Sequence, residues 1–392
     1  MPVVNRVAAF HEDMKAWRRE IHSYPELCFE ERRTADLVAA KLESFGIEVH
    51  RGLATTGVVG TLRAGNSKRA VGLRADMDAL PMGEDNTFGY KSLNAGRMHA
   101  CGHDGHTAML LGAAKYLAET RNFDGTVHFI FQPAEEGGGG GRVMVEEGLF
   151  DKFPVEAVYG MHNWPGLEAG RFSVRPGPMM ASADQFDLTI RGLGTHGAMP
   201  HRGVDPVVCA AQIVTALQTI ASRETNPLDA VVISVTQIHA GEAYNVIPNE
   251  CVMRGTVRAF EPKIRAGLPA AMERIAGGIA KAMGCEAALA YKHGYPPLVN
   301  TAPEVEIAAA AMAEVVGGER VTTDGVATMG SEDFAFMLEA KPGAYVFLGN
   351  GTTASLHNPK YDFNDDILPV GASYWATLVE QTLARGKAAK AA

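Results

Sequence analysis

The feature that most constrains the fold is a change of pattern near the middle of the chain. Up to about residue 183, short apolar runs alternate with helical patterns, which is typical of an α/β domain with a covered sheet. From residue 184 to about 295 the order becomes strand, helix, strand, strand, helix, strand, the βαββαβ order of a ferredoxin-like unit. We therefore expect 184–295 to be a domain inserted into a first domain of residues 1–183 and 296–392. Two domains in linear order are the alternative.

Hydrophobic periodicity places the individual elements. Apolar or alternating runs predict strands, and helical periodicity predicts helices. The expected strands are 58–62, 70–74, 126–131, 157–160, 185–191, 230–239, 251–259, 286–291 and 344–348, and the expected helices are 107–120, 206–222, 263–283 and 371–385.

Composition excludes several classes of protein. The chain has 392 residues, 46% hydrophobic and 21% charged, which suits a globular protein of two domains. The formal net charge is -9 and no basic block with interleaved aromatics occurs, so we expect neither nucleic acid nor a membrane as partner. No run has membrane-spanning length, and the N-terminal pattern is amphipathic, unlike a signal peptide. The five scattered cysteines predict reduced thiols and a cytoplasmic location.

A dense group of potential metal ligands lies at residues 99–106. Cys101 and His103 are one residue apart, so in an extended or turning loop both side chains can converge on one or two ions. A thiolate with imidazole suits zinc, manganese, cobalt or nickel. The alternatives are a polar surface loop with incidental histidines and a buried structural thiol. We interpret His99 and His106 as supporting or helix-start residues and not as ligands.

Two adjacent carboxylates follow the expected strand 126–131. Neighbouring side chains of an extended segment diverge, so we assign Glu136 to metal and Glu135 to general base and acid catalysis. A solvated surface pair is the alternative. The five glycines that follow resemble a phosphate loop, but they lack the Gly-Lys-Ser/Thr sequence of one.

A second pair of carboxylates, Asp76 and Asp78, lies two residues apart at a strand end. We predict that one of them, Asp78, orients a ligand by accepting its outer N–H, with helix capping as the alternative. For His162 and His357, spacing alone favours an ordinary core or surface histidine.

Long ordered segments together resemble the dimetal aminoacylase and carboxypeptidase family. The similar branch contains hippurate hydrolases, bacterial N-acyl-amino-acid amidohydrolases and plant auxin-conjugate amidohydrolases. The segments that carry the resemblance are Arg19-Glu20-Ile21-His22 with Pro25-Glu26-Leu27, then LRADMDALP, HACGHDGHTA, FQPAEEG, GMHNWPG, GTHGAMPH, NVIPNE, MGSEDFAF and LHNP.

The resemblance implies a fold and a metal site. The fold would be α/β, with a mixed-sheet, zinc-exopeptidase-like catalytic domain and an inserted ferredoxin-like lid and dimerisation domain. Two divalent ions per subunit, zinc or manganese before cobalt or nickel, would be held by residues spread along the chain. These implied ligands are Cys101, His103, Glu136, His162 and His357, with Cys101 in the bridging position that a carboxylate fills in other members. Glu135 matches the catalytic base.

The resemblance also implies residues outside the metal site. His196 matches a histidine that stabilises the oxyanion in the active site of the partner subunit, in a homodimer or a dimer of dimers. Asn245 and Arg258 match residues that bind the carboxylate of the substrate, although a turn residue and a surface ion pair are equal alternatives.

The expected reaction is metal-assisted hydrolysis of an N-acyl amino acid to a carboxylic acid and a free amino acid. A deaminase or other non-peptidic amidohydrolase, and a dipeptidase or carboxypeptidase, would use the same metals. A metal-binding protein without catalysis is the remaining alternative, and the presence of Glu135 argues against it.

Overall fold

The computed structural model describes residues 4–385, which divide into two compact units. The first unit runs up to Gly177 and continues through Val299–Val326 and from Asp333, and the second comprises Pro178–Leu298 and Ala327–Glu332. The expected boundaries at 184 and 295 lie inside the second unit. The short strands β7 (Gly177–Met180) and β14 (Leu298–Asn300), which carry the chain between the units, are too short to produce a clear periodicity. Residues 1–3 and 386–392 of the expected first domain lie outside the described residues.

The first unit is built on a mixed sheet, which has eight strands in the described part of the chain, in the order β1-β2-β4-β3-β5-β16-β6-β15. Its centre is hydrophobic, with β3 buried at every position, as expected for strands covered on both faces. The strands are β1 (Glu48–Leu53), β2 (Gly57–Ala64), β3 (Ala70–Asp76), β4 (Gly125–Gln132), β5 (Ala157–Pro165), β6 (Phe172–Ser173), β15 (Val321–Thr322) and β16 (Gly343–Gly351).

Four neighbouring strands of this sheet run in the same direction. β3 pairs in parallel with β4 and with β5, and β5 pairs in parallel with β16. The carboxyl ends of all four therefore meet at one edge of the sheet, where α/β proteins commonly place their chemistry.

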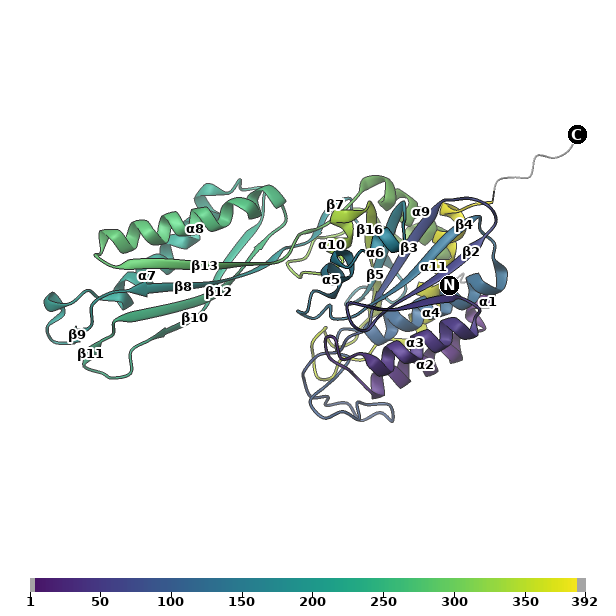
Figure 1. Ribbon diagram of the computed structural model, residues 1–392, viewed down its shortest axis with the longest axis horizontal. Helices are drawn as coiled ribbons and strands as arrows, with labels where there is room; N and C mark the ends of the chain where they lie inside the picture. Colours follow the sequence, from purple (N-terminus) through teal and green to yellow (C-terminus); the bar gives the residue numbers. More distant parts are fainter. Residues whose placement is uncertain (1–3, 386–392) are drawn as a thin grey trace, which may run out of the picture. The chain divides into compact units, whose positions relative to one another are not determined.

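Helices cover the sheet (Figure 1). The helix α4 (His103–Thr120) packs against β3 and is flanked by α2 (His11–Ser23), α3 (Arg32–Ser44) and α11 (Leu368–Thr382). Most of α4 is buried, since it lies between the sheet and other helices. The remaining helices are α1 (Asn5–Ala8), α5 (Gly140–Glu146), α6 (Leu149–Lys152), α9 (Ala302–Val316) and α10 (Ala335–Ala340), with short 3₁₀ turns at Gly318–Arg320 and Asp365–Ile367.

The second unit has its own sheet and its own hydrophobic core. The strands lie in the order β10-β12-β8-β13 and each pairs antiparallel with its neighbours, which is the ferredoxin-like arrangement expected from the sequence. Its elements are β8 (Ala183–Arg191), β9 (Thr195–His196), a 3₁₀ turn (Pro200–Arg202), α7 (Pro206–Thr219), a π-helical turn (Ile220–Glu224), β10 (Val231–Ala240), β11 (Val246–Ile247), β12 (Glu250–Ala259), α8 (Pro262–Ala282) and β13 (Glu286–Tyr295).

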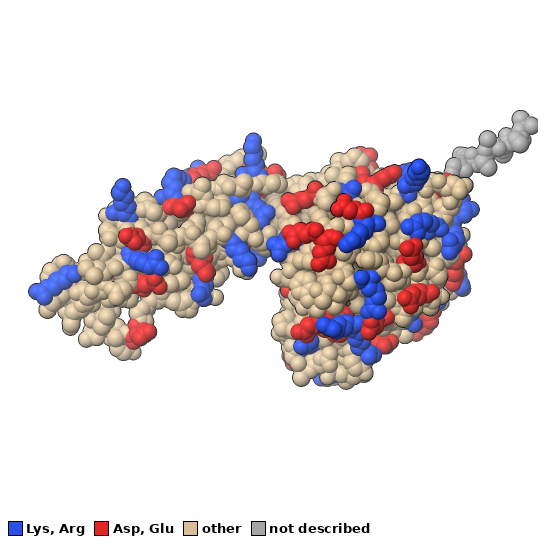
Figure 2. All heavy atoms as spheres, viewed as in Figure 1, with Lys and Arg blue, Asp and Glu red and all other residues tan. Residues whose placement is uncertain are grey.

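The surface carries charges of both signs. Lys and Arg are interspersed with Asp and Glu on the face of each unit that Figure 2 shows. Between residues 4 and 385, no helix combines the length and the apolar character needed to cross a membrane.

Candidate active site

The candidate residues of the first unit gather where the parallel strands end. Asp76 is the last residue of β3, Glu135 follows the end of β4, and His162 lies near the end of β5. His357 follows β16 in the chain, and Cys101 lies two residues before the start of α4. The topology therefore brings together residues that are more than 250 positions apart in sequence.

The chain turns sharply between Cys101 and α4. Gly102 has a φ of 95°, and a Cβ atom there would lie 2.1 Å from the Asn163 side-chain nitrogen, so only glycine fits. The helix begins at His103, four residues earlier than the periodicity predicted. His103 and His106 thus lie on the first turn of a helix and not in a loop, which makes their positions rigid.

Cys101 belongs to two overlapping groups of potential ligands. One group is Cys101, His103 and His162, and the other is Cys101, Glu136 and His357. Within each group the ligand atoms lie within 4.8 Å of one another. Two groups that share one thiol would supply donors to two cations. The five residues are those that the resemblance to the dimetal family implies.

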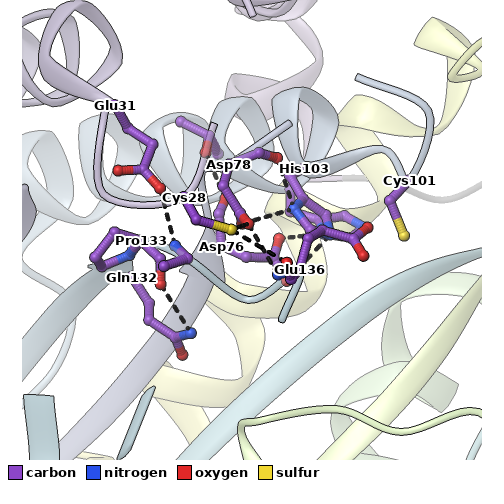
Figure 3. A network of polar contacts seen from close by, with 12 residues as sticks. Cys28, Glu31, Asp76, Asp78, Cys101, His103, Gln132, Pro133 and Glu136 are labelled. Atoms are coloured by element: carbon purple, nitrogen blue, oxygen red, sulfur yellow. Dashed lines mark hydrogen bonds and ion pairs between the residues drawn. The ribbon is translucent and has the colours of Figure 1, made fainter. Parts of the chain in front are cut away.

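His103 has the hydrogen bonding of a metal ligand (Figure 3). Its Nδ1 lies 2.9 Å from the Asp78 carbonyl oxygen and 3.2 Å from Asp78 Oδ1, so the ring N–H donates to this residue. Its buried Nε2 has no hydrogen-bond partner. A buried imidazole nitrogen without a hydrogen-bond partner, on the ring whose other nitrogen donates to Asp78, fits a bound cation that replaces the proton of this nitrogen. Asp78 thus accepts the outer N–H of His103.

The charges around His103 attract a positive charge. Burial opposes protonation, but Asp76 and the hydrogen-bonded Asp78 raise the pKa of His103 to about 10. Burial, followed by the repulsion of His106, holds the pKa of His162 well below its ordinary value, so this ring is neutral and able to ligate. Burial and the nearby carboxylates raise the pKa of the Cys101 thiol, so a cation must displace its proton.

His162 and His357, the other two histidines of the set, are held in place by hydrogen bonds or by their backbone conformation. His162 Nδ1 donates to the Asn163 carbonyl at 2.6 Å, and its Nε2 lies 3.3 Å from Cys101 Sγ. His357 has a φ of 61°, a left-handed conformation that is strained for this residue, and its Nε2 lies 3.1 Å from Glu136 Oε1. Such strain often occurs at functional sites.

Glu135 and Glu136 lie in a turn and not in the extended segment that we expected. The Gly137 amide donates to the Glu135 carbonyl at 2.7 Å, which closes the turn. As a result both carboxylates reach toward His103, and the three form a further group within 4.8 Å. The two side chains therefore do not diverge as we expected, although both remain candidates for the roles assigned to them.

His106 forms a further group of potential ligands with Asp76 and His103, but both of its ring nitrogens make hydrogen bonds. Its Nδ1 lies 2.6 Å from Asp76 Oδ1, and its Nε2 accepts the Asn163 amide hydrogen at 2.9 Å. His99 is fully buried, and neither of its ring nitrogens has a partner.

His196, Asn245 and Arg258 belong to the second unit, where they lie at two different ends. His196 pairs with Val246 in the β9–β11 ribbon, and the Gly197 amide donates to the Asn245 carbonyl at 2.7 Å. Arg258 is near the end of β12 and donates to Ser331 Oγ at 3.2 Å. The eight residues of β12 before Arg258 span about 26 Å. Within one copy of this unit, Arg258 and Asn245 are therefore too far apart to contact one small ligand.

Sequence reasoning missed two residues behind the carboxylate pair, Cys28 and Glu31. Cys28 Sγ lies 3.1 Å from the Glu136 carbonyl oxygen, and Glu31 accepts the Ala134 amide hydrogen at 2.9 Å. Glu31 stands in a Glu-Glu-Arg-Arg run that resembles an exposed helix start, so no local pattern indicates its burial.

The fold and the ligand set define a class of protein, the hydrolases that hold two metal ions at the carboxyl edge of a mixed α/β sheet. The model of peptidase family M20/M25/M40 matches residues 72–381, and the chain belongs to this family.

The chain is also similar to characterised relatives over most of its length. It is 42% identical to the hippurate hydrolase of Campylobacter jejuni, over 96% of this chain and 98% of the relative. It is 47% identical to the N-acyl-L-amino acid amidohydrolase of Geobacillus stearothermophilus, over 74% and 78%. A solved structure from Bacillus subtilis, described as a dinuclear metal binding peptidase from the M20 family, superposes with a TM-score of 0.85 at 35% identity, covering 96% and 99%.

Proposed function

We propose that this chain hydrolyses the amide bond of N-acyl amino acids, releasing a carboxylic acid and a free amino acid. The observation that carries the proposal is the pair of ligand groups that share Cys101, with the carboxylate of Glu135 beside His103. The names of the relatives, which include a hippurate hydrolase and an N-acyl-L-amino acid amidohydrolase, support the substrate class.

The ligands would be Cys101, His103, Glu136, His162 and His357. Two divalent cations, when bound, would acidify a water molecule and polarise the acyl oxygen. Thiolate and imidazole donors favour zinc, while the carboxylate also suits manganese. Cobalt and nickel are accepted by the same donor set.

Glu135 is the general base and acid of the proposed reaction. It takes a proton from the attacking water and later delivers that proton to the leaving nitrogen. Its side chain is buried, which keeps bulk water from competing for the proton. His196 would stabilise the negative charge that develops on the acyl oxygen, and Asn245 and Arg258 would bind the carboxylate of the substrate.

We infer further that the protein is a homodimer. The strand β10 is an edge strand, and an unpaired edge strand invites pairing with a second chain. Large apolar side chains are exposed in the same unit, including Ile238 on β10, Val208 on α7 and Val246 on β11. In a dimer, His196 and Asn245 of one copy would serve the metal site of the other, which explains why they lie far from Arg258. A dimer of dimers is compatible with the same contact.

We place the protein in the cytoplasm, because all five cysteines are unpaired.

The test is a substrate panel. The protein, stripped of metal and reloaded with zinc, manganese, cobalt or nickel, is assayed with N-benzoyl, N-acetyl, long-chain acyl and indoleacetyl amino acids. We expect metal-dependent release of free amino acid and carboxylic acid in equal amounts. Release of ammonia would indicate a deaminase, and turnover of peptides alone would indicate a dipeptidase or carboxypeptidase.

A further inference from the structure

The segment that carries Glu135 and Glu136 is held from behind by residues to which the proposed reaction gives no role. These are Cys28 and Glu31, which lie between α2 and α3 in the chain (Figure 3). Both contact the catalytic segment directly, at opposite ends of it.

The buried carboxylate of Glu31 accepts three hydrogen bonds. Its Oε1 accepts the amide hydrogens of Phe29 at 3.0 Å and of Ala134 at 2.9 Å, and its Oε2 accepts the Thr56 hydroxyl hydrogen at 2.6 Å. The side chain is fully buried. A buried carboxylate is costly unless its oxygens are satisfied, so the three donors and Glu31 stabilise one another.

Strained backbone surrounds this carboxylate. Six residues other than glycine have a positive φ in the described chain, and four of them lie at its donors or within two residues of one: Phe29 at 63°, Ala54 at 48°, Thr55 at 74° and Ala134 at 57°. Strain of this kind persists only where the surroundings determine the conformation, and it clusters at functional sites. Ala134 immediately precedes Glu135, so its dihedral angles set the direction in which Glu135 leaves the strand end.

Cys28 holds the other end of the segment. Its thiol hydrogen is within reach of the Glu136 carbonyl oxygen at 3.1 Å and of Asp78 Oδ2 at 3.4 Å. The same Asp78 oxygen accepts the Glu136 amide hydrogen at 2.8 Å, and Asp78 also accepts from His103. Cys28 and Asp78 thus hold the main chain of Glu136 by both its carbonyl and its amide.

We propose that Glu31 and Cys28 are positioning residues that hold the Glu135–Glu136 turn in the conformation needed for proton transfer and metal binding. Glu31 imposes the left-handed conformation of Ala134, and Cys28 orients the peptide groups of Glu136. The inference rests on the proposed function only for the expected changes in kcat and KM. Metal binding by the same turn is measured without any substrate.

The variants separate positioning from folding. Glu31→Ala removes all three acceptor contacts. Glu31→Gln keeps an oxygen for the two amides and offers its NH₂ to the Thr56 hydroxyl. Ala134→Gly, added to Glu31→Ala, makes the left-handed conformation accessible without the carboxylate. Glu30→Ala is the matched control, since Glu30 is the neighbouring exposed glutamate and pairs with Arg97 on the surface.

Four quantities are measured for each variant: kcat, KM, the dissociation constant for Co²⁺, and the visible absorption spectrum of the Co²⁺-loaded protein. For Glu31→Ala we expect kcat to fall about 100-fold, KM to change less than about threefold, and the spectrum to shift, because a small misplacement of a catalytic group is costly. Glu31→Gln should keep most of the wild-type kcat. The double variant, Glu31→Ala with Ala134→Gly, should have a kcat about tenfold higher than Glu31→Ala alone. Glu30→Ala should match the wild type.

A folded Glu31→Ala protein with wild-type kcat and an unchanged Co²⁺ spectrum would overturn the proposal, even if its melting temperature fell. Failure of the double variant to recover would contradict the role of the Ala134 backbone. Should Glu31→Ala not fold, Cys28→Ala decides: we expect Co²⁺ to bind about tenfold more weakly, and wild-type binding and kcat would refute the positioning role. If the wild type hydrolyses no N-acyl amino acid, the proposed function fails while the Co²⁺ measurements still test the turn.

Discussion

The thiol of Cys101 is the side chain on which both groups of candidate ligands depend, since it belongs to each. Burial and the neighbouring carboxylates of Glu136 and Glu135 raise its pKa, so without metal the sulfur keeps its proton at neutral pH. A cation that binds there must release that proton, which couples metal affinity to pH.

This coupling predicts the behaviour of Cys101→Asp. Aspartate keeps an oxygen donor at this position but carries no proton to displace at neutral pH. The variant should therefore still bind two equivalents of metal, and it should release about one proton fewer per chain than the wild type does. The preference should move from zinc toward manganese, because a carboxylate is a harder donor than a thiolate. Calorimetric titration in buffers of different ionisation enthalpy counts the protons. An equal proton count for wild type and variant would contradict the proposed role of the thiol.

Single residues could be proposed where several potential ligands lie close together in sequence. Cys101, His103 and the glutamate pair could be proposed from their local motifs, whereas His162 and His357 are isolated histidines that only the family resemblance singled out. Glu31 could not be predicted, because its carboxylate is buried by residues 56 and 134, which are remote in sequence.

At the scale of elements, a buried ion pair joins α2 to α4. His22 Nδ1 lies 2.8 Å from Asp104 Oδ2, and His22 Nε2 lies 3.2 Å from Glu84 Oε1. Burial opposes the charge on the ring, but the bonds to Asp104 and Glu84 raise the pKa of His22 to about 9. Asp104 is the second residue of α4, next to His103, so this pair anchors the helix start that carries a candidate ligand.

The raised pKa predicts a pH-dependent stability. The folded state binds the His22 proton more tightly than the unfolded state, so the stabilisation is complete below about pH 6.5 and is lost as the pH rises through about 9. Between pH 6 and 9.5, the free energy of unfolding of the wild type should fall by about 2–3 kcal/mol relative to His22→Gln. Urea denaturation of both metal-free proteins measures this. A difference that stays constant over this range would show that His22 does not carry the linkage.

Most elements were predictable from periodicity, but their ends were not. The start of α4 was placed too late, because Gly102 and the histidines that follow it do not continue the apolar stripe. The turn at Glu135 and Glu136 was taken as extended, because the contacts that impose it come from Glu31, Cys28 and Asp78.

At the scale of the whole molecule, the βαββαβ order led us to expect an inserted domain, because this order closes one sheet without help from the rest of the chain. The short strands at its borders and the six-residue segment 327–332 were not predictable, since they are too short to show a period. The proposed dimer follows from the exposed edge strand β10.

The dimer makes a prediction about complementation. His196→Ala and Glu135→Gln should each be inactive, while an equimolar mixture after subunit exchange should recover about a quarter of the wild-type rate, because half of the dimers are mixed and each has one intact site. The control mixes either single variant with the double variant, which carries both His196→Ala and Glu135→Gln, and this mixture should recover no activity. Absence of recovery after proven exchange would remove the role of His196 in the partner's site.

The central claim is that Glu135 moves the proton at a site where other residues hold the metal. Glu135→Gln tests it most directly, with metal content and turnover measured on the same preparation. The account predicts two equivalents of metal, as in the wild type, and a kcat that is at least about 100-fold lower. A variant that turns over near the wild-type rate with its metal in place would contradict the account.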